Sequence, residues 1–120
     1  MNTETLYQKL GGKDAVDAAI DIFYSKVLAD DHINHFFEGV DMATQARKQK
    51  IFMTYAFGGI PTYSGENMRS AHKHLKLEES HFTAVATHLQ ATLEELKVPT
   101  DLITEVMTIA ASTHDDVLNL

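Results

Sequence analysis

Cysteine is absent from this 120-residue sequence. Its absence excludes disulfide bonds, iron–sulfur clusters and metal centres built on thiolates. The sequence also lacks an apolar run near the ~20 residues that a membrane-spanning helix requires. Its first residues lack the basic segment and the apolar stretch of a secretory signal. From these absences we expect a soluble cytoplasmic protein with no membrane partner.

Positive charge is scarce in the chain. Lysine and arginine together number 10 against 17 aspartates and glutamates, which gives a formal net charge of −7. The longest basic cluster is the short run at residues 47–50. Because nucleic-acid-binding proteins present a basic patch or stripe to phosphates, we expect no nucleic-acid partner. The sequence gives no indication of an obligate subunit interface, and we expect a monomer.

Strand-type alternation and internal repeats are also missing, whereas helical periodicity recurs. Apolar residues spaced by three and four positions predict helices at residues 14–29, 41–57, 79–96 and from 99 onward, with shorter pieces at 5–10, 33–37 and 66–75. Gly11 and Gly12 end the first piece, Asp41 is the expected N-cap of its helix, and Pro99 is expected in the first turn of the last long helix. We predict a single all-α domain over residues 1–120.

Two glutamines interrupt the apolar stripe of the helix at residues 41–57. Gln45 and Gln49 lie one turn apart on the stripe that includes Met42, Phe52 and Ala56. Burying an amide without a partner costs about 1–3 kcal/mol, so this stripe is either solvated or faces a polar ligand in a cavity. In the second case the two amides can converge on one point. Spacing alone leaves both interpretations open.

Aromatic residues at two positions carry similar alternatives. Tyr24 adjoins the apolar face of its helix, where a buried hydroxyl would need a hydrogen-bond partner. A half-buried tyrosine with its tip in water fits the same spacing. Phe37 either packs in the core or lies against a flat cofactor.

Seven histidines are many for a chain of this length. None forms the i,i+4 pair typical of a helical zinc site. For His32, His35 and His114, which lie near predicted helix ends, a solvated imidazole is the default expectation. His72 differs because it follows a glycine-rich loop and faces the candidate cavity. Haem iron needs one strong axial base, and a single histidine provides it.

These residues fall in the order and spacing of a known family. The series is Leu10-Gly11-Gly12, Phe23-Tyr24, Phe36-Phe37, Val40-Asp41-Met42, Gln45, Gln49, Phe57-Gly58-Gly59, Tyr63, Gly65, Met68, His72 and His81-Phe82. By this series the chain resembles the group I truncated haemoglobins over nearly its whole length. The complete order and spacing is far more specific than any single dipeptide within it.

The resemblance implies a two-on-two helical sandwich around haem b. His72 would be the proximal iron ligand, and Tyr24 would donate a hydrogen bond to O2 from the distal side. Gln45 and Gln49 would complete the distal polar network. The remaining pocket residues would be Phe37 on the haem face, Phe52, Tyr63, Met68, Leu77, Phe82 and Val85 along the walls, and Lys48 or Arg69 near the propionates.

The chain departs from the family at several places. The segment between His72 and His81 is short, as in compact members. Some relatives link haem covalently through a histidine of the last helix; His114 lies near that place, but its spacing to the following residues is one short, and we expect no link. Where several relatives carry a second axial ligand, this chain has Lys48. Its amine either binds the iron in neutral form, as in some algal relatives, or extends to a propionate.

Three functions are consistent with the sequence. The first is reversible binding of O2, and of NO and CO, at ferrous haem, with nitric oxide dioxygenation to nitrate in combination with an external reductase; strong distal donors suit this better than oxygen transport. The second is a six-coordinate haem protein, ligated by Lys48, for electron transfer or detoxification of reactive species. The third belongs to another class: a haem-free helical interaction module with a divalent metal held by His72, His74 and His81.

Overall fold

Every regular element in the part of the chain that the structure describes is a helix. The computed structural model describes residues 4–60, 72 and 76–118. Its elements are α1 (Leu6–Leu10), α2 (Gly12–Leu28), the 3-10 helix η1 (Asn34–Phe37), α3 (Met42–Ala56), α5 (Glu79–Glu95), α6 (Thr100–Ala111) and α7 (His114–Leu118). The all-α prediction is confirmed, with the four long helices close to their expected positions. None of the described helices is long and apolar enough to cross a bilayer.

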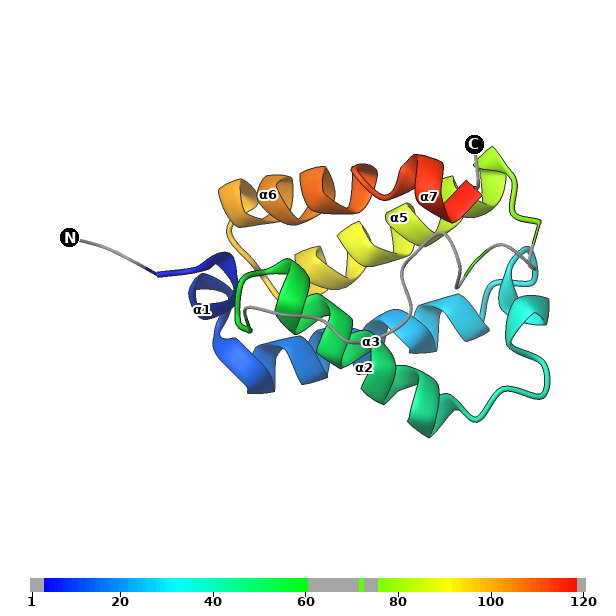
Figure 1. Ribbon diagram of the computed structural model, residues 1–120, viewed down its shortest axis with the longest axis horizontal. Helices are drawn as coiled ribbons and strands as arrows, with labels where there is room; N and C mark the ends of the chain where they lie inside the picture. Colours follow the sequence, from blue (N-terminus) through cyan, green and yellow to red (C-terminus); the bar gives the residue numbers. More distant parts are fainter. Residues whose placement is uncertain (1–3, 61–71, 73–75, 119–120) are drawn as a thin grey trace.

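The four long helices form two antiparallel pairs. Figure 1 shows α2 with α3 in the lower part of the view and α5 with α6 in the upper part. The two helices of each pair are in contact, and α2 also packs directly on α5, so that α2 joins the two pairs. The short helix α1 lies against α2 and α6. This arrangement is the predicted two-on-two sandwich.

Local sequence signals determine where several helices begin. The Thr5 side chain caps α1 by accepting from the Gln8 backbone N–H at 3.2 Å, and Asp41 caps α3 by accepting from the Ala43 N–H at 3.2 Å. Gly11 separates α1 from α2 with a φ of +116°. A side chain there would adopt a strained backbone, and its Cβ would lie 2.9 Å from the Ala15 Cβ. The predicted break and the predicted Asp41 cap are both confirmed.

A second glycine permits a close approach at the end of α3. The Tyr7 backbone N–H donates to the Phe57 carbonyl at 2.9 Å, which brings α1 onto the end of α3. A Cβ on Gly59 would lie 2.7 Å from the Tyr7 ring and 2.8 Å from Thr54. This corner therefore requires glycine because of space rather than because of φ.

Two details of the C-terminal half differ from the prediction. Pro99 is the N-cap of α6, with an extended ψ of 142°, and the helix itself begins at Thr100. The expectation that Pro99 lies within the first turn was therefore wrong by one residue. The short helix α7 was not predicted, because its sequence is mostly polar and shows no helical apolar period.

The core is centred on α2. Val16, Ile20, Phe23 and Val27 are buried along one stripe, as the spacing predicted. On α5 the predicted stripe is only partly buried: Leu89 and Leu93 are buried, whereas Val85 and Leu96 are each 37% exposed. Leu96 lies at the C-cap, beyond the packed part of the helix.

Thr92 is the buried polar residue of α5 that the sequence reading missed. Its side chain is fully buried, and its hydroxyl donates to the His88 carbonyl one turn earlier at 2.8 Å. Because this bond satisfies the hydroxyl locally, the residue can pack as a small apolar side chain would.

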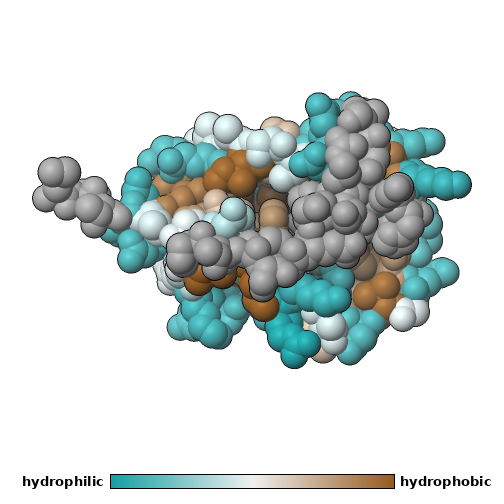
Figure 2. All heavy atoms as spheres, viewed as in Figure 1, coloured by the Kyte–Doolittle hydropathy of each residue, from teal (hydrophilic) through white to brown (hydrophobic). Residues whose placement is uncertain are grey.

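An apolar cavity of about 170 Å³ lies between the two helix pairs. Its walls come from α2, the end of α3, α5 and α6, and they include Val16, Ile20, Phe57, Leu93 and Val106. Figure 2 shows apolar surface gathered between α6 and α3 on one face of the molecule. Such a cavity favours small apolar guests over water, since it offers almost no hydrogen-bond partners.

A histidine links the beginnings of α5 and α7. His114 Nε2 lies 2.7 Å from Glu79 Oε2, and His114 Nδ1 lies 2.9 Å from Asp115 Oδ1. The ring also packs edge-on against Phe82, with centroids 5.0 Å apart. The expectation of a solvated imidazole at His114 was therefore wrong. The carboxylates of Asp115 and Glu79 raise the pKa of His114 above its ordinary value.

Replacing His114 by glutamine should lower the free energy of unfolding most strongly in acid. Because the folded-state pKa is raised above the ordinary 6.5, the charged ring contributes fully below about pH 6.5 and loses that contribution as pH rises through the raised value. Urea unfolding of parent and variant over a pH series measures this difference. Glu79→Gln removes one of the two carboxylates and should show a pH dependence of the same sign but smaller size, because Asp115 still pairs with His114. A difference that grows with rising pH would contradict the assignment.

Candidate functional site

The centre of the site is a hydrogen bond between α2 and α3. Tyr24 is only 7% exposed, and its hydroxyl oxygen accepts from the Gln45 side-chain amide at 3.2 Å. The partner that the sequence reading required for a buried Tyr24 is therefore present. Of the two interpretations of the glutamine stripe, the structure favours the polar cavity wall for Gln45, because this amide is part-buried and engaged.

The Tyr24 hydroxyl retains its proton and can donate it. Burial raises the pKa of Tyr24 above its ordinary value of 10, and the hydrogen bond from Gln45 acts in the opposite direction. Because the oxygen accepts from Gln45, the O–H bond is directed elsewhere. The hydrogen bonds between described residues include no acceptor for this proton. A phenol in this state can donate to a small polar ligand beside it.

Aromatic rings fix the orientation of Tyr24. Its ring lies edge-on to Phe23, with centroids 5.2 Å apart, and edge-on to Phe37 of η1 at 5.8 Å. Edge-to-face pairs at these distances are attractive and directional. Phe37 is half-buried and therefore reaches the site as well as the core.

The other predicted residues of α3 differ in exposure. Gln49 and Phe52 are half-buried, whereas Lys48 is exposed. On an ideal helix Gln45, Lys48, Gln49 and Phe52 share one side, with Lys48 at its edge. An exposed amine needs no loss of charge, so this position favours the extended, solvated form of Lys48 over the iron-bound one.

Three further predicted pocket residues lie on α5 or just before it. Phe82 and Leu77 are half-buried, and Val85 is 37% exposed. Phe82 and Val85 lie one turn apart on α5.

His72 is the one residue between positions 61 and 75 that the structure describes. Its backbone is helical and its side chain is half-buried. The other predicted site residues of this region, Tyr63, Met68 and Arg69, lie outside the described residues, as do His74 and the rest of the predicted helix at 66–75.

These residues fit the haem that the sequence resemblance implies. Haem needs one axial imidazole, apolar walls and few polar groups near the bound ligand. The chain offers His72, half-buried aromatic and aliphatic side chains, and one phenol–amide pair with a free proton to donate. In the part of the chain described, no three histidine or carboxylate side chains converge to hold a metal ion directly. The donor set suits a porphyrin-bound metal better than a divalent ion held by side chains.

Sequence reasoning missed the polar contacts that position this site. The loop after α2 is tied to α5 by Asp30, whose carboxylate lies 2.7 Å from His88 Nε2 and also accepts from the His32 N–H at 2.9 Å. The His88 bond is the largest cause of the lowered pKa of Asp30. Local sequence pattern does not reveal this contact, because the partner of Asp30 is 58 residues away.

Comparison with known proteins identifies the family. A model of the family described as "Bacterial-like globin" matches residues 5–119. The "Group 1 truncated hemoglobin GlbN" of Synechocystis is 57% identical, with 96% of this chain and 98% of the relative covered. This match spans both helix pairs and every predicted site residue.

Solved structures agree in fold. The 2/2 hemoglobin of Synechococcus, a cyanomet form with covalently attached heme, superposes with a TM-score of 0.95 at 51% identity, covering 98% of this chain and 100% of that one. Truncated hemoglobin from Tetrahymena pyriformis gives a TM-score of 0.91 at 43% identity, covering 96% and 98%. The latter is an Fe(III) form in which a tyrosine is replaced by phenylalanine. On this evidence the chain belongs to the bacterial-like globin family and is a group 1 truncated hemoglobin.

Proposed function

We propose that this protein binds O2, and also NO and CO, on haem b, with His72 as the proximal ligand. The haem supplies a ferrous iron with a coordination position for a diatomic ligand. The protein supplies the axial base, the apolar enclosure and the hydrogen-bond donors. Haem as cofactor follows from membership of the globin family.

The buried Tyr24–Gln45 pair is the observation that carries the proposal. Reduced iron shifts negative charge onto O2, and a donor in a low-dielectric pocket stabilises that charge. Tyr24 has the proton to donate, and Gln45 holds its oxygen in place. Gln49, one turn further along α3, would complete the donor set. The residue types replaced in solved variants of the Tetrahymena pyriformis protein are likewise tyrosine and glutamine.

The remaining predicted residues would enclose the macrocycle. Phe37 would lie on its distal face, beside Tyr24. The propionates would reach the edge of the pocket, where the exposed Lys48 offers a positive charge. Arg69 is the second candidate for that role. The apolar walls would come from Phe52, Tyr63, Met68, Leu77, Phe82 and Val85.

A reaction suited to this site is nitric oxide dioxygenation. Bound haem would supply the ferrous iron that converts O2 and NO to nitrate with the loss of one electron. Each cycle therefore needs one electron from an external reductase. A strong distal donor favours this use. When O2 dissociates slowly, NO has time to react with it before it leaves. The same property disfavours oxygen transport.

The two other hypotheses gain less support. Lys48 is exposed, so we propose that it pairs with a propionate rather than with the iron. A haem-free interaction module with a divalent metal is disfavoured by globin family membership. Its proposed ligand His81 also already accepts a backbone hydrogen bond through Nδ1.

A visible spectrum tests the proposed function directly. Purified protein supplied with hemin should show a strong Soret band, and His72→Ala should weaken or abolish it because the axial base is lost. His74→Ala, which removes a neighbouring histidine, should leave the band in place. A parent protein that takes up no hemin would end the proposal.

Tyr24→Phe should speed O2 dissociation from the ferrous protein by roughly tenfold or more. This is the size expected when a hydrogen bond worth about 1.4 kcal/mol or more is removed. Stopped-flow displacement of O2 by CO measures the rate. Tyr55→Phe, on the 40% exposed tyrosine of α3, serves as a matched control. An unchanged rate in Tyr24→Phe would remove Tyr24 from the donor role.

Lys48→Ala should leave the spin state of the ferric protein unchanged near neutral pH. The reason is that an exposed, charged amine has no lone pair to offer the iron. Absorption and electron paramagnetic resonance spectra of both proteins make the comparison. Conversion from a low-spin to a high-spin spectrum would instead identify Lys48 as the sixth ligand.

A further inference from the structure

His81 caps the first turn of α5 through a hydrogen bond that only a neutral ring can form. The Glu78 backbone N–H donates to His81 Nδ1 at 2.9 Å. Nδ1 accepts because it carries no proton, so the ring proton must reside on Nε2. A charged imidazole carries protons on both nitrogens and cannot accept. Charging His81 therefore removes one of the bonds that begin α5.

Two further imidazoles surround this ring. His81 lies 4.8 Å from His32 and 6.4 Å from His35, measured between ring centroids. Phe36 packs edge-on to His81 at 5.0 Å and completes what we call the histidine cluster: His32, His35, Phe36 and His81. Neutral rings stack favourably at these separations. Two charged rings at 4.8 Å repel each other.

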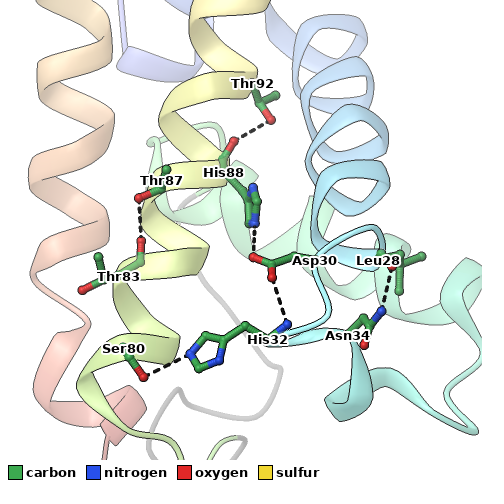
Figure 3. A network of polar contacts seen from close by, with 9 residues as sticks. All are labelled: Leu28, Asp30, His32, Asn34, Ser80, Thr83, Thr87, His88 and Thr92. Carbon is green, nitrogen blue, oxygen red and sulfur yellow. Dashed lines mark hydrogen bonds and ion pairs between the residues drawn. The ribbon is translucent and has the colours of Figure 1, made fainter.

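The histidine cluster joins the two walls of the candidate site. His32, His35 and Phe36 belong to the segment between α2 and α3, and the next residue, Phe37, touches Tyr24. His81 belongs to α5 and immediately precedes Phe82. Figure 3 shows the neighbouring polar contacts from α5 to the same segment: Ser80 to His32, at 3.1 Å, and His88 to Asp30, at 2.7 Å.

These connections respond differently to acid. The Asp30–His88 contact is strengthened when His88 is charged, and the lowered pKa of Asp30 keeps its carboxylate ionised well into the acid range. The His81 cap and the His32–His81 stack are weakened by protonation. Acid should therefore remove the His81 cap at the start of α5, while the Glu79–His114 and Asp30–His88 contacts stay in place.

Nearby carboxylates do not cancel this effect. Glu79, on the same turn, lies 2.7 Å from His114 and is engaged there together with Asp115. Asp30 accepts from the His32 backbone N–H and pairs with His88. Glu78 is exposed, so solvent screens its attraction for a charged His81. His32 and His35, which face His81 from the other element, are exposed as well, so solvent also weakens their repulsion, and the main effect of acid is loss of the His81 cap.

We propose that His81 is a positioning residue for the haem pocket: its neutral ring holds the first turn of α5, and with it Phe82, and protonation of the histidine cluster loosens this wall. The pocket role of Phe82 rests on the function proposed above, whereas the acid response of α5 does not. The ligand affected is haem itself. Acid should weaken its retention more in the parent than in a variant whose cap does not titrate.

The variant His81→Gln keeps the cap of α5 but removes the group that takes up a proton. Glutamine at the third position of a helix is the usual partner in a capping box, where its side-chain oxygen accepts from the N-cap N–H. It therefore supplies the same bond as neutral His81 but does not titrate. His88→Gln is the matched control, because it removes another histidine of α5 that contacts the same segment yet leaves the cap intact.

Amide hydrogen exchange of the haem-loaded protein, read by mass spectrometry, tests the acid response. Between about pH 7.5 and about pH 5, where imidazoles charge, protection of the first two turns of α5 should fall by about fivefold in the parent after correction for intrinsic rates, the size expected for loss of one hydrogen bond. The fall should persist in His88→Gln and disappear in His81→Gln. The same fall in His81→Gln, or none in the parent, overturns the proposal.

Hemin transfer to an excess of apomyoglobin tests the consequence for the pocket. Acidification over the same range should accelerate transfer from the parent by several-fold more than from His81→Gln, since both retain His72. Equal acceleration would overturn the pocket role of His81. Failure of the proposed function would look different, because the parent would then bind no hemin and show no Soret band at any pH.

Discussion

The hydrogen bond between Tyr24 and Gln45 is the constraint on which the site depends. A buried phenol must be satisfied, and α3 satisfies it by crossing α2 with a glutamine where an aliphatic residue would pack better. The apolar stripe of α2 fixes the Tyr24 backbone in the core, so the hydroxyl position is as rigid as the helix. In the proposed function, this scaffold would hold the hydroxyl in place beside the ligand. Preorganisation of this kind is what gives a single donor its influence on ligand release.

Histidine has a second use in this chain, as a connector between helices. Asp30 with His88 and Glu79 with His114 join elements that are far apart in sequence, and each pair exploits an imidazole beside a carboxylate in an acidic protein. The pKa of Asp30 is lowered and that of His114 is raised, so both pairs are intact together only between those limits. The His81 cap works in the opposite sense, since it needs a neutral ring. In the proposal made above, different histidines would therefore govern the stability of the fold and the order of the pocket wall.

The two walls of the site also differ in character. The α2–α3 wall carries a buried polar pair held by aromatic packing from Phe23 and Phe37. In the proposed pocket, α5 would contribute the apolar side chains of Phe82 and Val85, of which Val85 is 37% exposed. A flat, mainly apolar cofactor with one reactive polar centre matches this asymmetry, because only one side of it needs a donor. The apolar cavity of about 170 Å³ between the helix pairs would suit diatomic gases, which form few hydrogen bonds.

The sequence by itself determined the four long helices, the break at Gly11, the cap at Asp41 and the family. Periodicity located α2 and its core stripe, Gly11 and Asp41 marked helix ends, and the ordered series of residues identified a truncated haemoglobin. Each of these signals depends on neighbouring residues or on the order of residues along the chain, so it can be recognised in the sequence alone. Spacing could not decide whether Gln45 and Tyr24 were buried, since the same helical stripe can face water or a partner helix. Only the tertiary structure joined them, and only it paired Asp30 with His88 and His114 with Glu79, because hydrogen bonds between residues 58 and 35 positions apart leave no trace in local pattern.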